Sequence, residues 1–186
     1  YHVMTAGTEE ILERCQAGKD DIGFVYVLDE QMPSFQYRLE CAGLIFQELK
    51  RTKAYLYFGK DHPLAGKSGI EEIALDEVRL VQCYEDEYTL GRRMTEETDR
   101  ISPADRMKIS VITNSDYVMN ELLGKTDLGN VSGGYLSREK ESRGYPGYSL
   151  YGEKEPILFG CVSRQGERLD GWAEHYLEFV RNRLQE

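Results

Sequence analysis

Apolar runs and helical stripes alternate along the chain. Residues 22–28 (IGFVYVL) carry no charge, and such a short run is typical of a strand buried on both faces of a parallel sheet. Residues 169–184 instead repeat apolar side chains at helical spacing, which predicts a helix with one apolar stripe and Asp170 as its cap. Several strand, turn and helix units follow one another, so the sequence predicts an α/β fold with parallel strands.

Several of the predicted helices begin directly after a strand, at Thr8, Thr89 and Ser115. Helix N-termini carry N–H groups and a partial positive charge, and in parallel sheets they gather at the carboxyl edge, where ligands bind. A single Thr or Ser there can simply cap its own helix. Their joint occurrence favours a binding site for a carboxylate or phosphate.

The composition limits the classes of function. A chain of 186 residues, 40% hydrophobic and 11% aromatic, can form one or two compact domains. The formal net charge of −10 opposes contact with a phosphate backbone, which disfavours DNA binding by this segment alone. No apolar run approaches the roughly 20 residues of a membrane span, and no signal peptide opens the sequence, so we expect a cytoplasmic protein.

Residues that often carry chemistry are scattered. The cysteines are too widely spaced for a CxxC pair or a zinc site, and four reduced thiols are the favoured interpretation, although disulfides stay open. The histidines are interpreted as structural or surface residues. No GxGxxG, P-loop, GxSxG or HExxH motif occurs, so the sequence predicts no enzyme, no metal site and no cofactor. These cysteines and histidines are Cys15, Cys41, Cys83, Cys161, His2, His62 and His175.

A set of ordered motifs covers most of the chain. Residues 53–80 contain an apolar strand, then HPLA at residues 62–65, then a short segment before the next strand. Residues 18–25 (GKDDIGFV) precede this stretch, and residues 115–129 with Gly134 and residues 171–184 follow it. Together these pieces resemble the effector-binding domain of LysR-type transcriptional regulators.

The sequence also departs from that family's pattern. The family's winged-helix DNA-binding head, its linker helix and the first strand and helix of the effector domain are not found, so the resemblance implies an N-terminally truncated domain. Residues 127–131 (DLGNV) stand where the family has Gly-x-Gly-Ile-Ala, and residues 132–134 (SGG) replace the proline that follows. The exact walls of a binding pocket are therefore less well defined than the fold.

The resemblance implies a periplasmic-binding-protein-like fold with two Rossmann-like lobes and a ligand cleft between them. Residues 1–58 with 134–186 would form lobe one, and residues 59–133 would form lobe two. Both crossings between the lobes contain glycine, which suits a hinge. The expected hinge residues are Phe58, Gly59, Ser132 and Gly133.

By the same resemblance, a small-molecule effector binds in the cleft and shifts the equilibrium between two lobe arrangements. The helix starts favour an organic anion as effector, whereas the acidic residues 85–87 oppose one. The regulator would be a homodimer or homotetramer that contacts DNA only through the missing N-terminal domain, without a membrane partner. The expected effector-binding residues are Thr8, Tyr84, Glu85, Tyr88, Thr89, Asn114, Ser115 and Ser132.

Two other classes of protein stay open. A solute-binding protein of a transporter shares the expected fold, and the coding sequence upstream separates the two, since it encodes either a helix-turn-helix or a secretory signal. An enzyme with a similar two-lobed fold is disfavoured, because no His, Cys or acidic cluster indicates catalysis.

Overall fold

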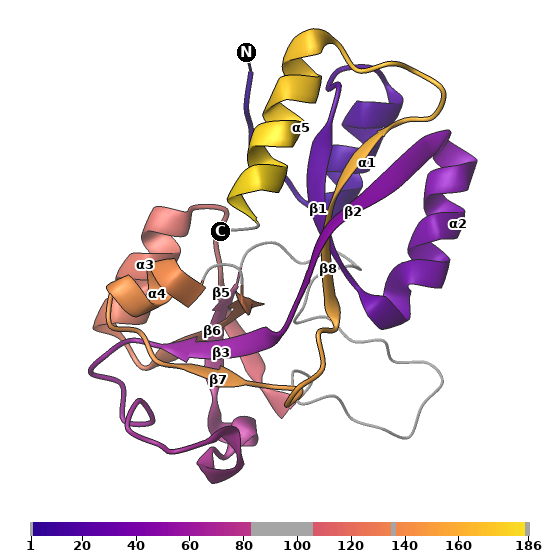
Figure 1. The fold of residues 1–186 in the computed structure, drawn as a ribbon. Coiled ribbons are helices and arrows are strands. Elements are labelled where there is room, and N and C mark those ends of the chain that lie inside the picture. Colours follow the sequence, from indigo (N-terminus) through magenta and orange to yellow (C-terminus); the bar gives the residue numbers. More distant parts are fainter. Residues whose placement is uncertain (1, 83–105, 135–136, 185–186) are drawn as a thin grey trace. The chain divides into compact units, whose positions relative to one another are not determined.

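A computed structural model describes residues 2–82, 106–134 and 137–184 of the chain. The chain forms two compact units (Figure 1). Unit 1 consists of Tyr1–Thr52 with Pro156–Glu186, and unit 2 consists of Lys53–Glu155. Each unit has its own β-sheet, and the expected mixed α/β class is confirmed.

The sheet of unit 1 contains β1 (Gly23–Leu28), β8 (Ile157–Arg164) and β2 (Leu44–Thr52), in the order β1-β8-β2. Both pairings are antiparallel, with Val25 opposite Gly160 and Phe46 opposite Val162. The parallel environment predicted for residues 22–28 is therefore wrong. The apolar run reflects burial by helices, because burial alone does not fix the direction of the neighbouring strand.

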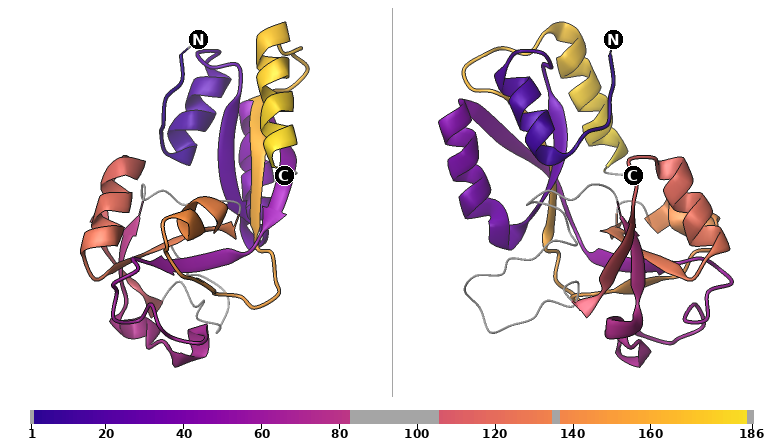
Figure 2. Two further views of the ribbon diagram at one scale, coloured as in Figure 1. Left: turned by 60° about the vertical axis from the view of Figure 1, so that its left-hand side comes forward. Right: turned by 180° about the vertical axis from the view of Figure 1, so that it is seen from behind.

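Helices cover both faces of this sheet. Gly23 faces α1 (Thr8–Gln16), where a Cβ would lie 2.3 Å from the Ile11 side chain. The next residue, Phe24, points to the other face and contacts Tyr176 of α5 (Gly171–Arg183) at 5.9 Å between ring centroids. Figure 2 shows α1 and α5 on opposite sides of the strands.

α2 (Met32–Ala42) follows the short 3-10 helix η1 (Asp29–Gln31) and packs on the α1 face. Its Phe35 lies edge-on to Phe46 of β2, with 5.6 Å between the ring centroids. Gly160 provides the space for the Phe46 ring, since a Cβ there would lie 2.3 Å from it. Sequence patterning did not assign this region, because its apolar residues fit neither a helical nor a strand period over their whole length.

The predicted final helix is present as α5, and Asp170 caps it by accepting hydrogen bonds from the Trp172 and Ala173 N–H groups. The predicted apolar stripe included Trp172 and Phe179, which are 65% and 55% exposed. The buried residue of the helix is Leu177, 7% exposed, which lies outside that stripe. Helical periodicity thus located the helix but not the face that packs on the sheet.

The sheet of unit 2 has the order β5-β4-β6-β3-β7. β4 pairs in parallel with both β5 and β6, while β3 runs antiparallel to β6 and β7. The parallel strands expected from the sequence are therefore found here and not in unit 1. The strands are β3 (Ala54–Phe58), β4 (Arg79–Gln82), β5 (Lys108–Ile112), β6 (Leu128–Gly133) and β7 (Gly147–Ser149).

α3 (Asp116–Lys125) connects β5 to β6 and covers β4 and β6. Its Met119 packs in a buried cluster with Val81 of β4 and Leu128 of β6. The helix runs past Gly124 and closes at Thr126. Further helical segments among the described residues include α4 (Ser137–Ser142) and the 3-10 turns η2 (Ile70–Glu72) and η3 (Leu75–Glu77).

The unit boundaries differ from the lobe boundaries expected at residues 58–59 and 133–134. The contacts divide the chain after Thr52 and before Pro156. Phe58 lies opposite Gly129, and Gly133 lies opposite Ala54, so both ends of the β3–β6 ladder belong to unit 2. The glycines that indicated hinges serve paired strands and a turn within one unit.

Candidate functional site

The start of α3 is a well-defined helix N-terminus. Ser115 is the N-cap, and its Oγ accepts a hydrogen bond from the Val118 N–H at 3.3 Å. The Ser115 N–H in turn donates to Thr113 Oγ1 at 3.1 Å. The predicted cap is confirmed, and Asn114 lies exposed beside it. A helix begins with four N–H groups that lack intrahelical acceptors, so one side-chain cap leaves donor capacity at this end.

This helix start lies at the carboxyl edge of the parallel strands of unit 2. The Thr113 N–H donates to the Gln82 carbonyl at 3.0 Å, which ties the loop before α3 to the end of β4. In α/β folds, ligands bind outside this edge, where connections leave in opposite directions. β4 lies between β5 and β6, so its carboxyl end is inside this edge of the sheet. Asn114 and Ser115 are thus placed where an anionic group is favoured.

Thr8 occupies a different position from the one expected. It is the first residue of α1, and the N-cap is Gly7, with extended backbone (φ −69°, ψ 161°). The prediction that Thr8 caps the helix is wrong by one residue. Glu9 and Glu10 fill the first turn, and Glu9 Oε2 lies 3.2 Å from Arg38 Nη2. These carboxylates already complement the helix dipole, so α1 favours an anion less than α3 does.

The remaining expected site residues divide into two groups. Ser132 is half-buried in β6, where it lies opposite Tyr55 of β3. Asn114 and Ser115 follow β5 of the same sheet. The structure therefore places three expected residues in unit 2 and Thr8 in unit 1. The others lie outside the described residues, namely Tyr84, Glu85, Tyr88 and Thr89.

His62, from the HPLA motif, has a structural role. Its Nδ1 accepts a hydrogen bond from the Leu64 N–H at 3.0 Å, so Nε2 carries the proton and donates to the Asp127 carbonyl at 3.1 Å. The ring stacks on Phe58 with 4.1 Å between centroids. His62 thereby joins the turn after β3 to the turn between α3 and β6, which supports the interpretation of a structural histidine.

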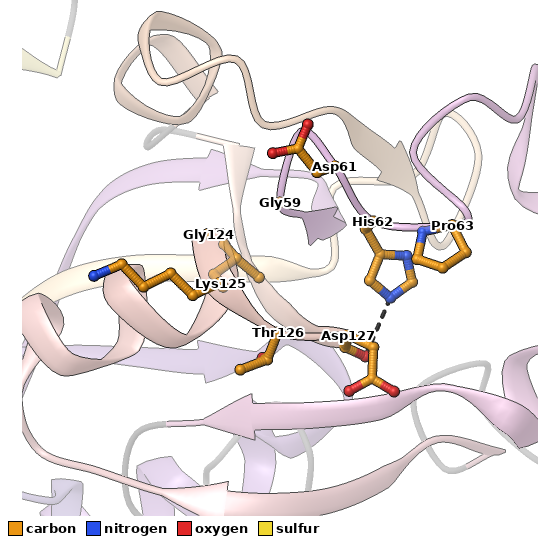
Figure 3. Close-up of a pocket in the computed structure, with 9 residues that line it drawn as sticks. Gly59, Asp61, His62, Pro63, Gly124, Lys125, Thr126 and Asp127 are labelled. Carbon is orange, nitrogen blue, oxygen red and sulfur yellow. Dashed lines mark hydrogen bonds between the residues drawn. The ribbon is translucent and has the colours of Figure 1, made fainter.

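A cavity of about 500 Å³ lies beside His62, at the C-terminal end of α3 (Figure 3). The Lys125, Thr126 and Asp127 side chains that line it already have partners. Lys125 Nζ lies 2.5 Å from Glu121, and Thr126 Oγ1 donates to the Leu122 carbonyl at 2.6 Å. The Asp127 carboxylate pairs with Arg79, whose hydrogen bond lowers the pKa of Asp127. This cavity is at the opposite end of α3 from Ser115, and we favour the helix start because its donors suit a ligand.

Two described features bear on other chemistry. Within the ranges given above, no group of three or more His, Cys, Asp or Glu side chains is arranged to hold a metal ion. Among the same residues, no helix has the length and apolar character needed to cross a membrane.

Sequence reasoning missed two buried amides, Gln82 and Asn130, each 3% exposed. They lie at the carboxyl end of β4 and in the neighbouring part of β6, and the Asn130 Nδ2 donates to Gln82 Oε1 at 2.6 Å. A polar residue that directly follows buried apolar residues in a strand, as Gln82 follows Leu80 and Val81, is a signal that could have identified them. Because Gln and Asn more often lie at the surface, that signal alone is weak.

Comparison with known proteins finds matches among solved structures only. No protein-family model and no curated protein matches the sequence. Among solved structures, the reduced form of OxyR superposes with a TM-score of 0.63 at 17% identity, covering 98% of this chain and 80% of that chain. The C-terminal domain of a probable LysR family regulator from Rhodococcus sp. RHA1 gives 0.60 at 16% identity, with 94% and 80% covered.

A probable transcriptional regulator from Pseudomonas aeruginosa, PA0477, is similar with a TM-score of 0.59 at 16% identity over 94% of this chain. The chain spans only 52% of the length of that regulator. At such identities the likeness establishes the fold and leaves function to be argued from the site. The chain has the fold of the regulatory domains of LysR-type transcriptional regulators.

Proposed function

We propose that the chain is the ligand-sensing domain of a LysR-type transcription factor and binds a small-molecule effector without catalysing a reaction. The observation that carries the proposal is the likeness to LysR-type regulatory domains over 94% to 98% of the chain. The capped start of α3, at the carboxyl edge of parallel strands, supplies a position where a ligand is favoured.

The proposed effector is a small organic anion. Its carboxylate or phosphate is attracted by the N–H groups at the start of α3, which Asn114 and Ser115 flank. Asp116 in the first turn weakens this attraction, and the helix dipole opposes that effect. The effector-binding residues proposed are Asn114, Ser115 and Ser132 of unit 2, Thr8 of unit 1, and Tyr84, Glu85, Tyr88 and Thr89.

The proposed mechanism is allosteric. An effector changes the balance between two arrangements of the protein only by its difference in affinity for them. In the complete regulator, a cytoplasmic homodimer or homotetramer, this change would alter how the DNA-binding domains meet the operator. DNA contact is assigned to a separate domain, since the net charge of −10 opposes it here.

The alternative is a solute-binding protein of a transporter. The similar structures from Pseudomonas aeruginosa and Rhodococcus sp. RHA1 are described as probable transcriptional regulators, which favours the sensing role. The coding sequence upstream distinguishes the two, because a helix-turn-helix belongs to the regulator and a secretory signal to the transport protein.

A thermal-shift screen of the purified chain with small organic acids and phosphate esters tests the proposal. A ligand at 100 times its Kd stabilises the folded state by about 2.7 kcal/mol, which raises the Tm of a protein of this size by several degrees. We expect at least one compound to do so. A panel that leaves the Tm unchanged at millimolar concentration contradicts the sensing role for this class of ligand.

The matched variants are Ser115→Ala and, as control, Ser110→Ala at an exposed position of β5. Each variant is compared with its own ligand-free Tm, since removal of the cap alone costs about 1 kcal/mol. The compound-induced shift should fall in Ser115→Ala and persist in Ser110→Ala. An equal shift in both variants means that the ligand binds elsewhere.

A further inference from the structure

The pairing of β4 with β6 stops before either strand ends. Among the described residues, the ladder joins Arg79 to Leu128 and Leu80 to Gly129, and β6 continues to Gly133. On its other side β4 stays paired with β5 as far as Gln82 and Ile112. The carboxyl end of β4 is therefore fixed to β5 by backbone hydrogen bonds, but not to β6.

Side chains occupy the place of the missing ladder. Gln82 Oε1 accepts a hydrogen bond from the Val131 N–H at 3.1 Å, and Gln82 Nε2 donates to the Val131 carbonyl at 3.3 Å. Asn130 Nδ2 donates to the Val81 carbonyl at 3.0 Å and to Gln82 Oε1 at 2.6 Å. The Gln82 amide thus bonds Val131 in the way that a neighbouring strand would. We call these contacts the amide bridge.

The amide bridge has one unsatisfied group. The partners of Gln82 fix the orientation of its amide, and Gln82 Oε1 then fixes Asn130 with Nδ2 toward it. Asn130 Oδ1 is left buried without a hydrogen-bond partner. A buried acceptor without a partner is costly, because its hydration is lost and nothing replaces it. The bridged arrangement therefore holds β4 to β6 less firmly than a continued backbone ladder.

We infer that the Gln82–Asn130 amide bridge is a releasable joint in the sheet of unit 2. One side of the joint is β4 with β5 and the start of α3, tied together by the bond from Thr113 to the Gln82 carbonyl. The other side is β6 with β3, paired from Phe58 to Ala54. A shift of the carboxyl end of β4 breaks these side-chain hydrogen bonds and slides Val81 against Leu128 of β6, while the β6–β3 ladder stays intact.

The joint offers a route for signalling, which rests on the proposed sensing function. The start of α3 lies on the β4–β5 side of the joint. The β6–β3 ladder on the other side reaches Ala54, and the Gly134 N–H donates to the Lys53 carbonyl at 2.9 Å, beside the boundary of the unit. A ligand that favours one position of β4 therefore changes the position of the β4–β5 side relative to the β6–β3 ladder.

Amide hydrogen exchange on the ligand-free chain, followed by NMR, tests the joint without an effector. The Val131 N–H faces β4, whereas those of Asn130 and Ser132 face β3, because orientation alternates along a strand. In Gln82→Met we expect exchange at Val131 to accelerate about tenfold, as for one lost hydrogen bond, while Asn130 and Ser132 change by less than about twofold. Gln47→Met, at an exposed position of β2, is the matched control and should change none of these rates.

Asn130→Leu is the second variant, because it removes the Asn130 Nδ2 donor to Gln82 Oε1 while leaving Gln82 and Val131 in place. Exchange at Val131 should again accelerate more than exchange at Ser132. Unchanged exchange at Val131 in Gln82→Met overturns the inference. Uniform acceleration throughout unit 2, or loss of folding in both variants, also overturns it, since the bridge would then support the whole sheet. Each result is independent of whether any effector binds.

Discussion

At the scale of the residue, burial decides which thiols can react. Cys15 and Cys161 are buried in unit 1, while Cys41 on α2 is exposed. Burial raises the pKa of Cys15 to about 11 and that of Cys161 to about 12. Because the thiolate is the reactive form, the two buried cysteines are not suited to redox sensing at neutral pH. The expected reduced state is consistent with their burial but is not tested by it.

Alkylation of the native chain should therefore be selective. With iodoacetamide at pH 7.5, we expect Cys41 to react within minutes, and Cys15 and Cys161 to react only when unit 1 unfolds. Peptide mass spectrometry of samples quenched over time measures each site separately. Reaction of Cys15 in the native chain as fast as that of Cys41 would falsify the burial described for α1 and β8.

At the scale of the element, the turn after β3 is held by one histidine. His62 bonds its own turn through Leu64 and the α3–β6 turn through Asp127. Gly59 begins the same turn and lies against α3, since a Cβ there would lie 2.0 Å from the Leu123 carbonyl oxygen. His62 of the HPLA run therefore makes structural contacts in this chain.

Replacing His62 should weaken unit 2 without affecting unit 1. His62→Phe keeps a ring to stack on Phe58 but removes two hydrogen bonds, so we expect a loss of about 1 to 3 kcal/mol in the free energy of unfolding. Urea unfolding followed by circular dichroism measures the change. His175→Phe, on the exposed side of α5, is the control and should lie within about 0.5 kcal/mol of the original chain. Equal stability of the two variants contradicts the role of His62.

The helices and strands also show how much of the fold the sequence can predict. The strands β1, β3 and β4 and the helices α1, α3 and α5 follow from apolar pattern and helix-start residues, because these signals are local. The antiparallel sheet of unit 1 and the face on which α5 packs do not, since each depends on a partner distant in sequence. The candidate site likewise has one part that local sequence predicts and one part that depends on distant residues. Ser115 follows from its capping pattern, whereas the amide bridge depends on two strands meeting.

At the scale of the whole molecule, the chain divides into two compact units. The unit boundaries at Thr52 and Pro156 lie outside the glycine-containing segments that the sequence indicated, because β3 and the segment after β6 pack with unit 2. The fold of a LysR-type regulatory domain is established by structural likeness over nearly the whole chain. The proposed sensing role rests on this likeness, and the start of α3 at the edge of parallel strands is the position proposed for the effector.

The most direct test of that role is an NMR titration of the isotope-labelled chain with the compound that stabilises it most in the thermal screen. The account predicts saturable shifts of the backbone amides from Ser115 to Val118, at the start of α3, with a midpoint that matches the Kd from the thermal data. Shifts confined to residues 59–63 and 123–127, around the cavity at the other end of α3, or no saturable shift in the described part of unit 2, would contradict it.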